Sequence, residues 1–418
     1  MSDFKKIAVV GLGYIGLPTA AMFASRKIEV IGVDVSPKVV DTVNRGEIHI
    51  VEPDLDMVVH AAVHEGYLRA SVSPEPADAF LVAVPTPFKG EDHEPDLSYI
   101  EAASNAIAPM LSSGNLVILE STCPVGATEK MAEWLAKARP DLSFPQDVGE
   151  TSDIRIAHCP ERVLPGKVMY ELVSNDRVIG GMTPKCSAHA AQLYKTFVTG
   201  ECVIASGPRA AEMAKLTENS FRDVNIAFAN ELSMICNRLD MDVWELIRLA
   251  NRHPRVNILQ PGPGVGGHCI AVDPWFIVAS APEEARLIAA AREVNDAKPG
   301  WVLDKVRAAI GAHMSQNPDQ TAREVTVAIY GLAFKPDIDD MRESPALDIA
   351  WRIAANHAGP LQIVEPNVTA LPEGLGAATL IPLGDVQAEV HVMLVDHRDF
   401  KNTPRPNGRI VDARGVWG

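Results

Sequence analysis

The chain has 418 residues, 47% of them apolar and 22% charged, and a formal net charge of −16 at pH 7. This length exceeds what one hydrophobic core usually organises, so we expect two or three domains. The acidic balance argues against a nucleic-acid surface, and no uninterrupted apolar stretch is long enough to span a bilayer.

The N-terminal residues carry the pattern of a dinucleotide-binding unit. A strand at 7–10 leads into the glycine-rich turn GLGYIG at 11–16, a helix follows at 17–25, and a strand at 29–33 ends on Asp34. This spacing allows a tight turn and the close approach of a pyrophosphate to the helix N-terminus. The acid can accept from ribose hydroxyls and repels a 2′-phosphate, which favours NAD over NADP. The residues expected at this cofactor are Gly11, Gly13, Tyr14, Ile15, Gly16 and Asp34.

Further apolar strands are expected at 80–84 and 116–119, and each is followed by a threonine, Thr86 and Thr122. Ligands of an open parallel sheet bind at the carboxyl ends of its strands, so both hydroxyls are candidates for the nicotinamide half of the cofactor. The alternative is that they are ordinary turn hydroxyls. Residues 154–162 are interpreted as another strand that runs into a functional loop.

From about residue 205 the pattern becomes helical and continues towards residue 236. A helix of about 30 residues would be roughly 45 Å long, which suits a spine that links domains or subunits. Lys215, Asn219 and Arg222 are spaced i, i+4 and i+7, so they share one face of this helix. They form either part of a site or a solvated charged stripe.

The segment GVGGHCIAVDP at 264–274 sets one cysteine, Cys269, in a glycine-rich loop. Together with a nicotinamide site, a thiol in such a loop favours two successive oxidations. A thiolate can capture an aldehyde, and the thiohemiacetal can lose a second hydride to become a thioester that water hydrolyses. The alternative is a glycine turn that contains a small buried cysteine.

A second α/β unit is expected after a helix at 282–309 and a turn-forming linker at 316–320. Its strands are predicted at 325–330, 361–364 and 390–395, with a helix at 346–355. Lys335 and Arg342 lie in the loop between the first of these strands and that helix. They can hold a phosphate or a carboxylate there, unless they are solvated loop charges.

The cysteines predict a reducing compartment. They are scattered and form no CxxC pair, which argues against a disulfide framework or a zinc site, and we expect no metal. The chain also enters its first strand without the apolar region of a signal peptide, so we expect a cytoplasmic protein. The six cysteines are Cys123, Cys159, Cys186, Cys202, Cys236 and Cys269.

Several motifs, in this order along nearly the whole chain, resemble those of the UDP-glucose/GDP-mannose dehydrogenase family. The segments NRHPRVNI at 251–258 and CIAVDPWF at 269–276 are most similar to the branch that oxidises UDP-N-acetyl-D-mannosamine. The motifs are GLGYIGLP (11–18), PTP (85–87), STCPVG (121–126), CPER (159–162), AAEMAKLTENSFRDVNIAFANE (210–231), GPGVGGHCIAVDP (262–274) and GLAFKPDIDDMRESPA (331–346).

The resemblance implies an α/β protein with three domains. A Rossmann-like NAD domain would span 1–204, an all-helical dimerisation domain 205–312, and a Rossmann-like domain that binds the UDP moiety 320–418. It implies a homodimer formed through the helical domain, a UDP-sugar as substrate, and a product used for surface polysaccharide. It implies no nucleic-acid or membrane partner.

The resemblance also implies roles for particular residues. Cys269 would be the nucleophile, and Lys215 would act as acid and base or stabilise the oxyanion beside Asn219. An ordered water remains an alternative general base; Asp273 and Thr122 would order a water near the reacting carbon. Glu161 would assist thioester hydrolysis, Arg342 would face cofactor or substrate, and His253 and Arg255 would reach the site from the partner subunit. The expected substrate-binding residues are Arg162, Val163, Lys215, Asn219, Arg222, His253, Arg255, Gly266 and Lys335.

These observations favour a four-electron oxidation of C6 of UDP-N-acetyl-D-mannosamine with NAD. UDP-N-acetylglucosamine, UDP-N-acetylgalactosamine and UDP-glucose remain alternative substrates, since one epimeric centre or acetamido group is discriminated by pocket shape. A one-step hydroxy-acid dehydrogenase would need neither Cys269 nor a third domain with Lys335. A non-catalytic sensor of NAD or nucleotide sugars would need no nucleophile.

Overall fold

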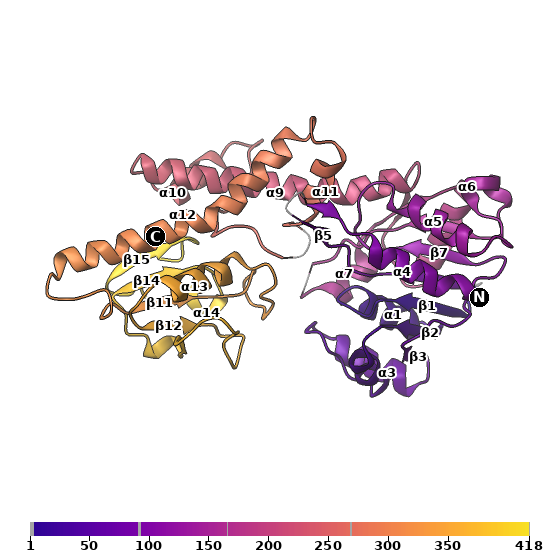
Figure 1. The fold of residues 1–418 in the computed structure, drawn as a ribbon, viewed down its shortest axis with the longest axis horizontal. Helices are drawn as coiled ribbons and strands as arrows, with labels where there is room; N and C mark the ends of the chain where they lie inside the picture. Colours follow the sequence, from indigo (N-terminus) through magenta and orange to yellow (C-terminus); the bar gives the residue numbers. More distant parts are fainter. Residues whose placement is uncertain (1–3, 91–92, 165, 268–269, 418) are drawn as a thin grey trace. The chain divides into compact units, whose positions relative to one another are not determined.

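The computed structural model divides the chain into two compact units, each with its own parallel sheet (Figure 1). The first unit contains residues 1–218 and 275–280, and the second contains 219–274 and 281–418. Among the described residues, no helix combines the length and the apolar character that a membrane span requires. The structure describes all residues except 1–3, 91–92, 165, 268–269 and 418.

The sheet of the first unit has eight strands: β1 (Lys6–Val10), β2 (Glu29–Val33), β3 (Leu68–Ser71), β4 (Ala79–Val82), β7 (Leu116–Leu119), β8 (Arg155–His158), β9 (Arg177–Gly181) and β10 (Cys202–Ile204). Their order is β10-β9-β8-β7-β4-β1-β2-β3, and every neighbouring pair is parallel except β8 and β9. The buried strands are rich in Val, Ile, Leu and Ala because helices cover both faces of the sheet. A short hairpin lies outside it: β5 (Phe88–Lys89) and β6 (Glu94–Pro95).

The helices of the first unit are α1 (Gly16–Ser25), α2 (Pro37–Asn44), α3 (Leu55–His64), α4 (Ser98–Ile107), α5 (Ala127–Ala138), α6 (Pro145–Val148), α7 (Val168–Ser174) and α8 (Pro184–Tyr194). Two further turns are 3-10 helices: η1 (Ala108–Met110) and η2 (Gly149–Thr151). Alternate residues of β1 point to opposite faces. Ile7 and Val9 pack into the core under α1, α3, α7 and α8, whereas Ala8 and Val10 pack under α4 and α5. The strand order reverses between β1 and β4, and a ligand crevice is expected at their carboxyl ends.

A single helix, α9 (Pro208–Arg238), is 31 residues long, which confirms the long helix that the sequence predicts. Its residues up to Glu218 belong to the first unit, and those from Asn219 onward belong to the second. Three further helices follow it in the chain: α10 (Val243–Ala250), α11 (Asp273–Ser280) and α12 (Arg286–Gln316). The end of α12 coincides with the start of the turn-forming linker predicted at 316–320.

The sheet of the second unit has five parallel strands: β11 (Val327–Tyr330), β12 (Leu361–Val364), β13 (Thr379–Leu380), β14 (Val390–Met393) and β15 (Arg409–Asp412). Their order is β13-β12-β11-β14-β15. Helix α12 packs along β14 and β15 (Figure 1). The other helices are α13 (Pro345–Asn356), α14 (Arg398–Lys401) and the 3-10 turn η3 (Leu383–Asp385). The chain has a parallel sheet in its N-terminal part, a second one in its C-terminal part, and long helices between these parts in the sequence. This element order confirms the predicted fold class.

Candidate active site

The glycine-rich turn joins β1 to α1 as the sequence predicts. Gly11 has φ +93°, and a Cβ on it would lie 2.4 Å from the carbonyl oxygen of Ala83. A Cβ on Gly16 would lie 1.7 Å from the carbonyl oxygen of Gly11, so α1 can start here only on a residue without a side chain. The N-cap residue of α1 is Ile15, whose apolar side chain cannot accept a hydrogen bond. The N-terminus of α1 is therefore suited to a pyrophosphate, and the residues fit the cofactor.

Asp34 follows β2, and its carboxylate is turned towards the same turn. One oxygen accepts from the backbone N–H of Leu12 at 3.0 Å, and the other accepts from Ser36 at 2.9 Å. These donors hold the carboxylate beside the glycine-rich turn, and a carboxylate in that place can accept from a ribose and repels a 2′-phosphate.

Thr86 and Thr122, which the sequence places after neighbouring strands, come into contact. The hydroxyl of Thr86 donates to the backbone carbonyl of Thr122. The adjacent Ser121 hydroxyl donates to the carbonyl of Val84 at 2.7 Å. These bonds join the loops after β4 and β7 at the carboxyl edge of the sheet, where the nicotinamide half was expected.

Glu212 on α9 anchors the second of these loops. Its carboxylate accepts from the backbone N–H of Gly126 at 2.7 Å, and from the N–H and hydroxyl of Thr128 at 2.9 and 2.6 Å. It therefore caps the N-terminus of α5, because the N-cap residue of this helix, Gly126, has no side chain that could do so. Glu212, Cys123 and His158 each have one atom of a type that can bind a metal ion, and these three atoms lie within 4.8 Å of one another. Burial lowers the pKa of His158 to about 3, so this imidazole is neutral.

Glu161 and Arg162 follow β8 and make different ion pairs. Buried Glu161 is 2.7 Å from Arg177 of β9 and also accepts from the backbone N–H of Arg162 at 2.6 Å. The guanidinium of Arg162 lies 2.7 Å from Glu218 on α9. Arg177 is not among the residues predicted from the sequence; a charge at the start of an apolar strand was the available signal.

Beneath this loop lies a buried polar cluster. Tyr194 donates to Glu120 at 2.7 Å, and burial raises the pKa of Glu120 to about 7. Burial also raises the pKa of Cys159 to about 12. Cys159 is therefore a thiol at neutral pH, unsuited to nucleophilic attack.

On α9, Lys215 is 9% exposed and Asn219 is 3% exposed, whereas Arg222 is exposed. Arg222 is therefore solvated, as the alternative of a charged surface stripe requires, whereas Lys215 and Asn219 are not. Within the second unit, the side-chain amide of Asn219 donates to the buried carboxylate of Asp273 at 2.5 Å. This bond ties α9 to the start of α11, four residues after Cys269 in the chain.

The glycine-rich loop packs against the loop that follows β11. A Cβ on Gly266 would lie 2.4 Å from the carbonyl oxygen of Glu343, and a Cβ on Gly267, at φ +85°, would lie 3.0 Å from the ring of Phe334. Glycine therefore permits the approach of the two loops. Cys269 and its neighbour His268 lie outside the described residues.

The remaining basic candidates belong to the second unit. Lys335 is half-buried, and Arg342 donates from Nε to Asp340 at 2.8 Å. His253 and Arg255 follow α10 and are exposed, and the backbone N–H of Arg255 lies 3.3 Å from Nδ1 of His253. Val163, in the first unit, packs against the core instead.

Both parallel sheets and the glycine-rich turn after β1 define the class of the fold, an α/β protein with a dinucleotide-binding unit. The sequence profiles of the UDP-glucose/GDP-mannose dehydrogenase family match its NAD binding domain at 5–198, its central domain at 209–297 and its UDP binding domain at 328–418. The chain belongs to this family, and it is an NAD-dependent nucleotide-sugar dehydrogenase.

Individual relatives are similar over their whole length. The UDP-N-acetyl-D-mannosamine dehydrogenase of Escherichia coli (strain K12) is 65% identical, over 99% of this chain and 100% of its own. The NDP-N-acetyl-D-galactosaminuronic acid dehydrogenase of Ralstonia nicotianae is 61% identical, over 99% of this chain and 97% of its own. A solved UDP-D-ManNAc dehydrogenase from Pyrococcus horikoshii superposes with a TM-score of 0.86 at 37% identity, covering 99% of this chain and 96% of its own.

Proposed function

We propose that this enzyme oxidises C6 of UDP-N-acetyl-D-mannosamine from alcohol to carboxylate, through a thiohemiacetal and a thioester on Cys269. The observation that carries the proposal is the buried bond between Asn219 and Asp273. It joins α9, which bears Lys215 one turn earlier, to the segment that directly follows Cys269. The 65% identity with a UDP-N-acetyl-D-mannosamine dehydrogenase supports the choice of sugar.

In the first oxidation, C6 loses a hydride while its hydroxyl loses a proton. NAD, held at the glycine-rich turn and Asp34, supplies the hydride acceptor in each of the two oxidations. Lys215 in its neutral form, or a water, takes the proton, and the amide N–H of Asn219 stabilises the developing alkoxide. Asp273 accepts from the second N–H of the same amide group and so fixes the orientation of the Asn219 side chain.

In the second oxidation, the thiolate of Cys269 adds to the aldehyde carbon, and the resulting oxyanion takes up a proton. The thiohemiacetal then loses that proton and a hydride, which leaves a thioester. Water attacks the thioester carbon, the C–S bond breaks, and the products are a carboxylate and the thiolate. We assign Thr122 and Asp273 to the ordering of water and Glu161 to its deprotonation. Arg177 lies 2.7 Å from the carboxylate of Glu161.

We assign a contact with either the cofactor or the substrate to Arg342. We assign recognition of the substrate to Arg162, Val163, Arg222, His253, Arg255, Gly266 and Lys335. The 61% identity with an NDP-N-acetyl-D-galactosaminuronic acid dehydrogenase keeps the galactosamine sugar as the second candidate. Both sugars carry an acetamido group, but they differ in the configuration of that group at C2 and of the hydroxyl at C4, so pocket shape decides between them.

The proposal predicts a stoichiometry of two NADH per nucleotide sugar. The measurement is NADH absorbance at exhaustion of UDP-N-acetylmannosamine, UDP-N-acetylglucosamine, UDP-N-acetylgalactosamine and UDP-glucose, with product identified by mass. We expect the largest kcat/KM with UDP-N-acetylmannosamine. One NADH per sugar would refute the thioester step, and a larger kcat/KM with another sugar would refute the substrate.

We also propose that α9 forms a homodimer interface. Phe221, Phe228 and Ile235 are spaced seven residues apart on this helix and are 69%, 54% and 45% exposed. Large apolar side chains at heptad spacing form a stripe that packs against another helix. The same stripe of a second copy matches it, because a two-fold axis brings identical surfaces together.

Replacing Phe228 with aspartate should convert the dimer to a monomer, because it buries a carboxylate in the centre of this stripe. Light scattering coupled to gel filtration measures the mass. Tyr170→Asp is the matched control, since Tyr170 is a 74% exposed aromatic residue on α7 of the first unit. A Phe228→Asp protein that stays dimeric while folded would remove α9 from the interface.

A further inference from the structure

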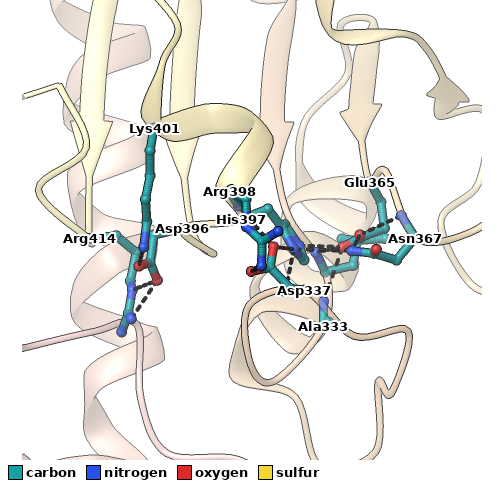
Figure 2. Close-up of polar contacts among 10 residues, drawn as sticks. Ala333, Asp337, Glu365, Asn367, Asp396, His397, Arg398, Lys401 and Arg414 are labelled. Carbon is teal, nitrogen blue, oxygen red and sulfur yellow. Dashed lines mark hydrogen bonds and ion pairs between the residues drawn. The ribbon is translucent and has the colours of Figure 1, made fainter. Parts of the chain in front are cut away.

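The loop at 331–337, which follows β11 and carries Lys335, is tied to two buried polar side chains (Figure 2). Glu365 is 3% exposed and directly follows β12, whereas His397 is 0% exposed and lies beyond the end of β14. Because β12, β11 and β14 are neighbours in the sheet, three loops meet at its carboxyl edge. This edge is where an open parallel sheet binds its ligand.

Glu365 holds the first part of the loop. Its Oε2 accepts from the backbone N–H of Leu332 at 2.7 Å and of Ala333 at 3.3 Å. Burial opposes ionisation of Glu365, but hydrogen bonds from His397 and Leu332 outweigh it and lower its pKa below the ordinary value. The ionised carboxylate supplies an acceptor to backbone groups that have left the strand ladder.

His397 holds the last part of the loop. Its Nδ1 accepts from the backbone N–H of Asp337 at 2.9 Å, which assigns the proton of the neutral ring to Nε2. Nε2 faces Oε2 of Glu365 at 3.1 Å, and the side-chain amide of Asn367 also lies 3.1 Å from Nδ1 (Figure 2). The two ends of the segment 332–337 are therefore held by one hydrogen-bonded pair, with Lys335 between them.

We propose that Glu365 and His397 are positioning residues, which hold this loop in the shape that presents Lys335 to the diphosphate of a nucleoside diphosphate. Both are buried, so they act through the loop rather than by touching the ligand. A loop fixed at both ends spares the ligand the entropic cost of ordering it, which raises affinity. This proposal rests on the proposed function, since it takes the diphosphate of the nucleotide sugar as the ligand.

The same sheet offers matched controls with the same residue types. His391 is buried within β14 and hydrogen-bonds to the hydroxyl of Tyr330 at 2.8 Å and the carbonyl of Asn407 at 2.9 Å. Glu389 precedes β14 and accepts from the backbone N–H of Thr326 at 2.7 Å. None of these partners lies in the loop at 331–337.

The test is calorimetric titration of the full-length protein with UDP, together with steady-state kinetics. In His397→Phe and Glu365→Gln we expect the Kd for UDP and the KM for the nucleotide sugar to rise about tenfold or more. We expect kcat to change less than about twofold, since the reacting groups are untouched. His397→Asn, whose Oδ1 can accept from Asp337 in place of Nδ1, should recover most of the affinity.

The outcomes separate this inference from the proposed function. UDP affinity close to wild type in folded His397→Phe and Glu365→Gln would overturn the positioning role, as would equal losses in His391→Phe and Glu389→Gln. Failure of the wild-type protein to bind UDP would overturn the proposed function and the inference together. If His397→Phe does not fold, hydrogen exchange decides on Glu365→Gln: faster exchange at 332–337 supports the role, and unchanged exchange contradicts it.

Discussion

Cys269→Ser should lower turnover by a factor on the order of a thousand or more, because a serine hydroxyl supplies almost no oxyanion at neutral pH where a thiol supplies some thiolate. The first oxidation needs no thiol, so the variant should still bind the nucleotide sugar and release at most one NADH for each aldehyde formed. Stopped-flow absorbance measures the NADH, and trapping with a hydrazine followed by mass analysis detects the aldehyde.

Cys202→Ser is the matched control for this experiment. Cys202, in β10, is half-buried, whereas the other described cysteines are buried, and burial raises its pKa above the ordinary value. It should keep the turnover of the wild-type enzyme and two NADH per sugar. Two NADH per sugar at near-normal turnover from Cys269→Ser would eliminate the thioester mechanism.

Arg292→Met should destabilise the second unit by roughly 3–5 kcal/mol, because it leaves a buried carboxylate without its counter-ion. Arg292 on α12 lies 2.7 Å from Asp223 on α9, and both side chains are buried. Asn295 donates to the same carboxylate at 2.8 Å and cannot replace the charge. The measurement is urea unfolding followed by tryptophan fluorescence of the full-length protein.

The pair Arg307 and Asp304, on the same helix, provides the control. Their atoms lie 2.9 Å apart with both side chains exposed, and Arg307→Met should change the free energy of unfolding by at most about 1 kcal/mol. Restoration of stability by adding Asp223→Leu to Arg292→Met would confirm that the cost is the unpaired charge. Equal effects of Arg292→Met and Arg307→Met would contradict this account.

The loss in Arg292→Met should also depend on pH. Burial already raises the pKa of Asp223 above its ordinary value in the folded protein, and removal of Arg292 raises it further. The folded variant then binds a proton at a pH where the unfolded chain has lost it. The deficit relative to wild type should therefore be complete above the folded pKa of Asp223 and shrink as the pH falls below that pKa.

Several features of the fold and the site could be predicted from the sequence alone. The turn at 11–16 and Asp34 were predictable because the dinucleotide motif is local: one turn, one helix N-terminus and the end of the next strand. The sequence placed Thr86 and Thr122 at one edge of the sheet because parallel strands share that edge, and the structure adds the hydrogen bond between them. The family, the fold class and NAD as cofactor are confirmed, whereas the domain boundaries and the roles of the site residues stay predictions.

Other features had no local signal. Arg177 beside Glu161 joins residues 16 positions apart, and His397 beside Glu365 joins residues 32 positions apart, through loops whose course the sequence does not reveal. Glu212 lies three residues before Lys215 on α9, but its partners Gly126 and Thr128 lie 84 to 86 residues away. Each pair depends on how elements that are distant in the sequence pack together in the fold.

The sequence by itself determined the cofactor and the family, because a glycine-rich turn, an acid after the second strand and the motifs of the family are all short-range patterns. Only the tertiary structure decided which polar groups are buried and paired: Asn219 with Asp273, Asp223 with Arg292, and Glu365 with His397. The physical reason is that burying a polar or charged group is costly unless a partner satisfies it. That partner comes from whichever element the fold packs beside it, often dozens of residues away.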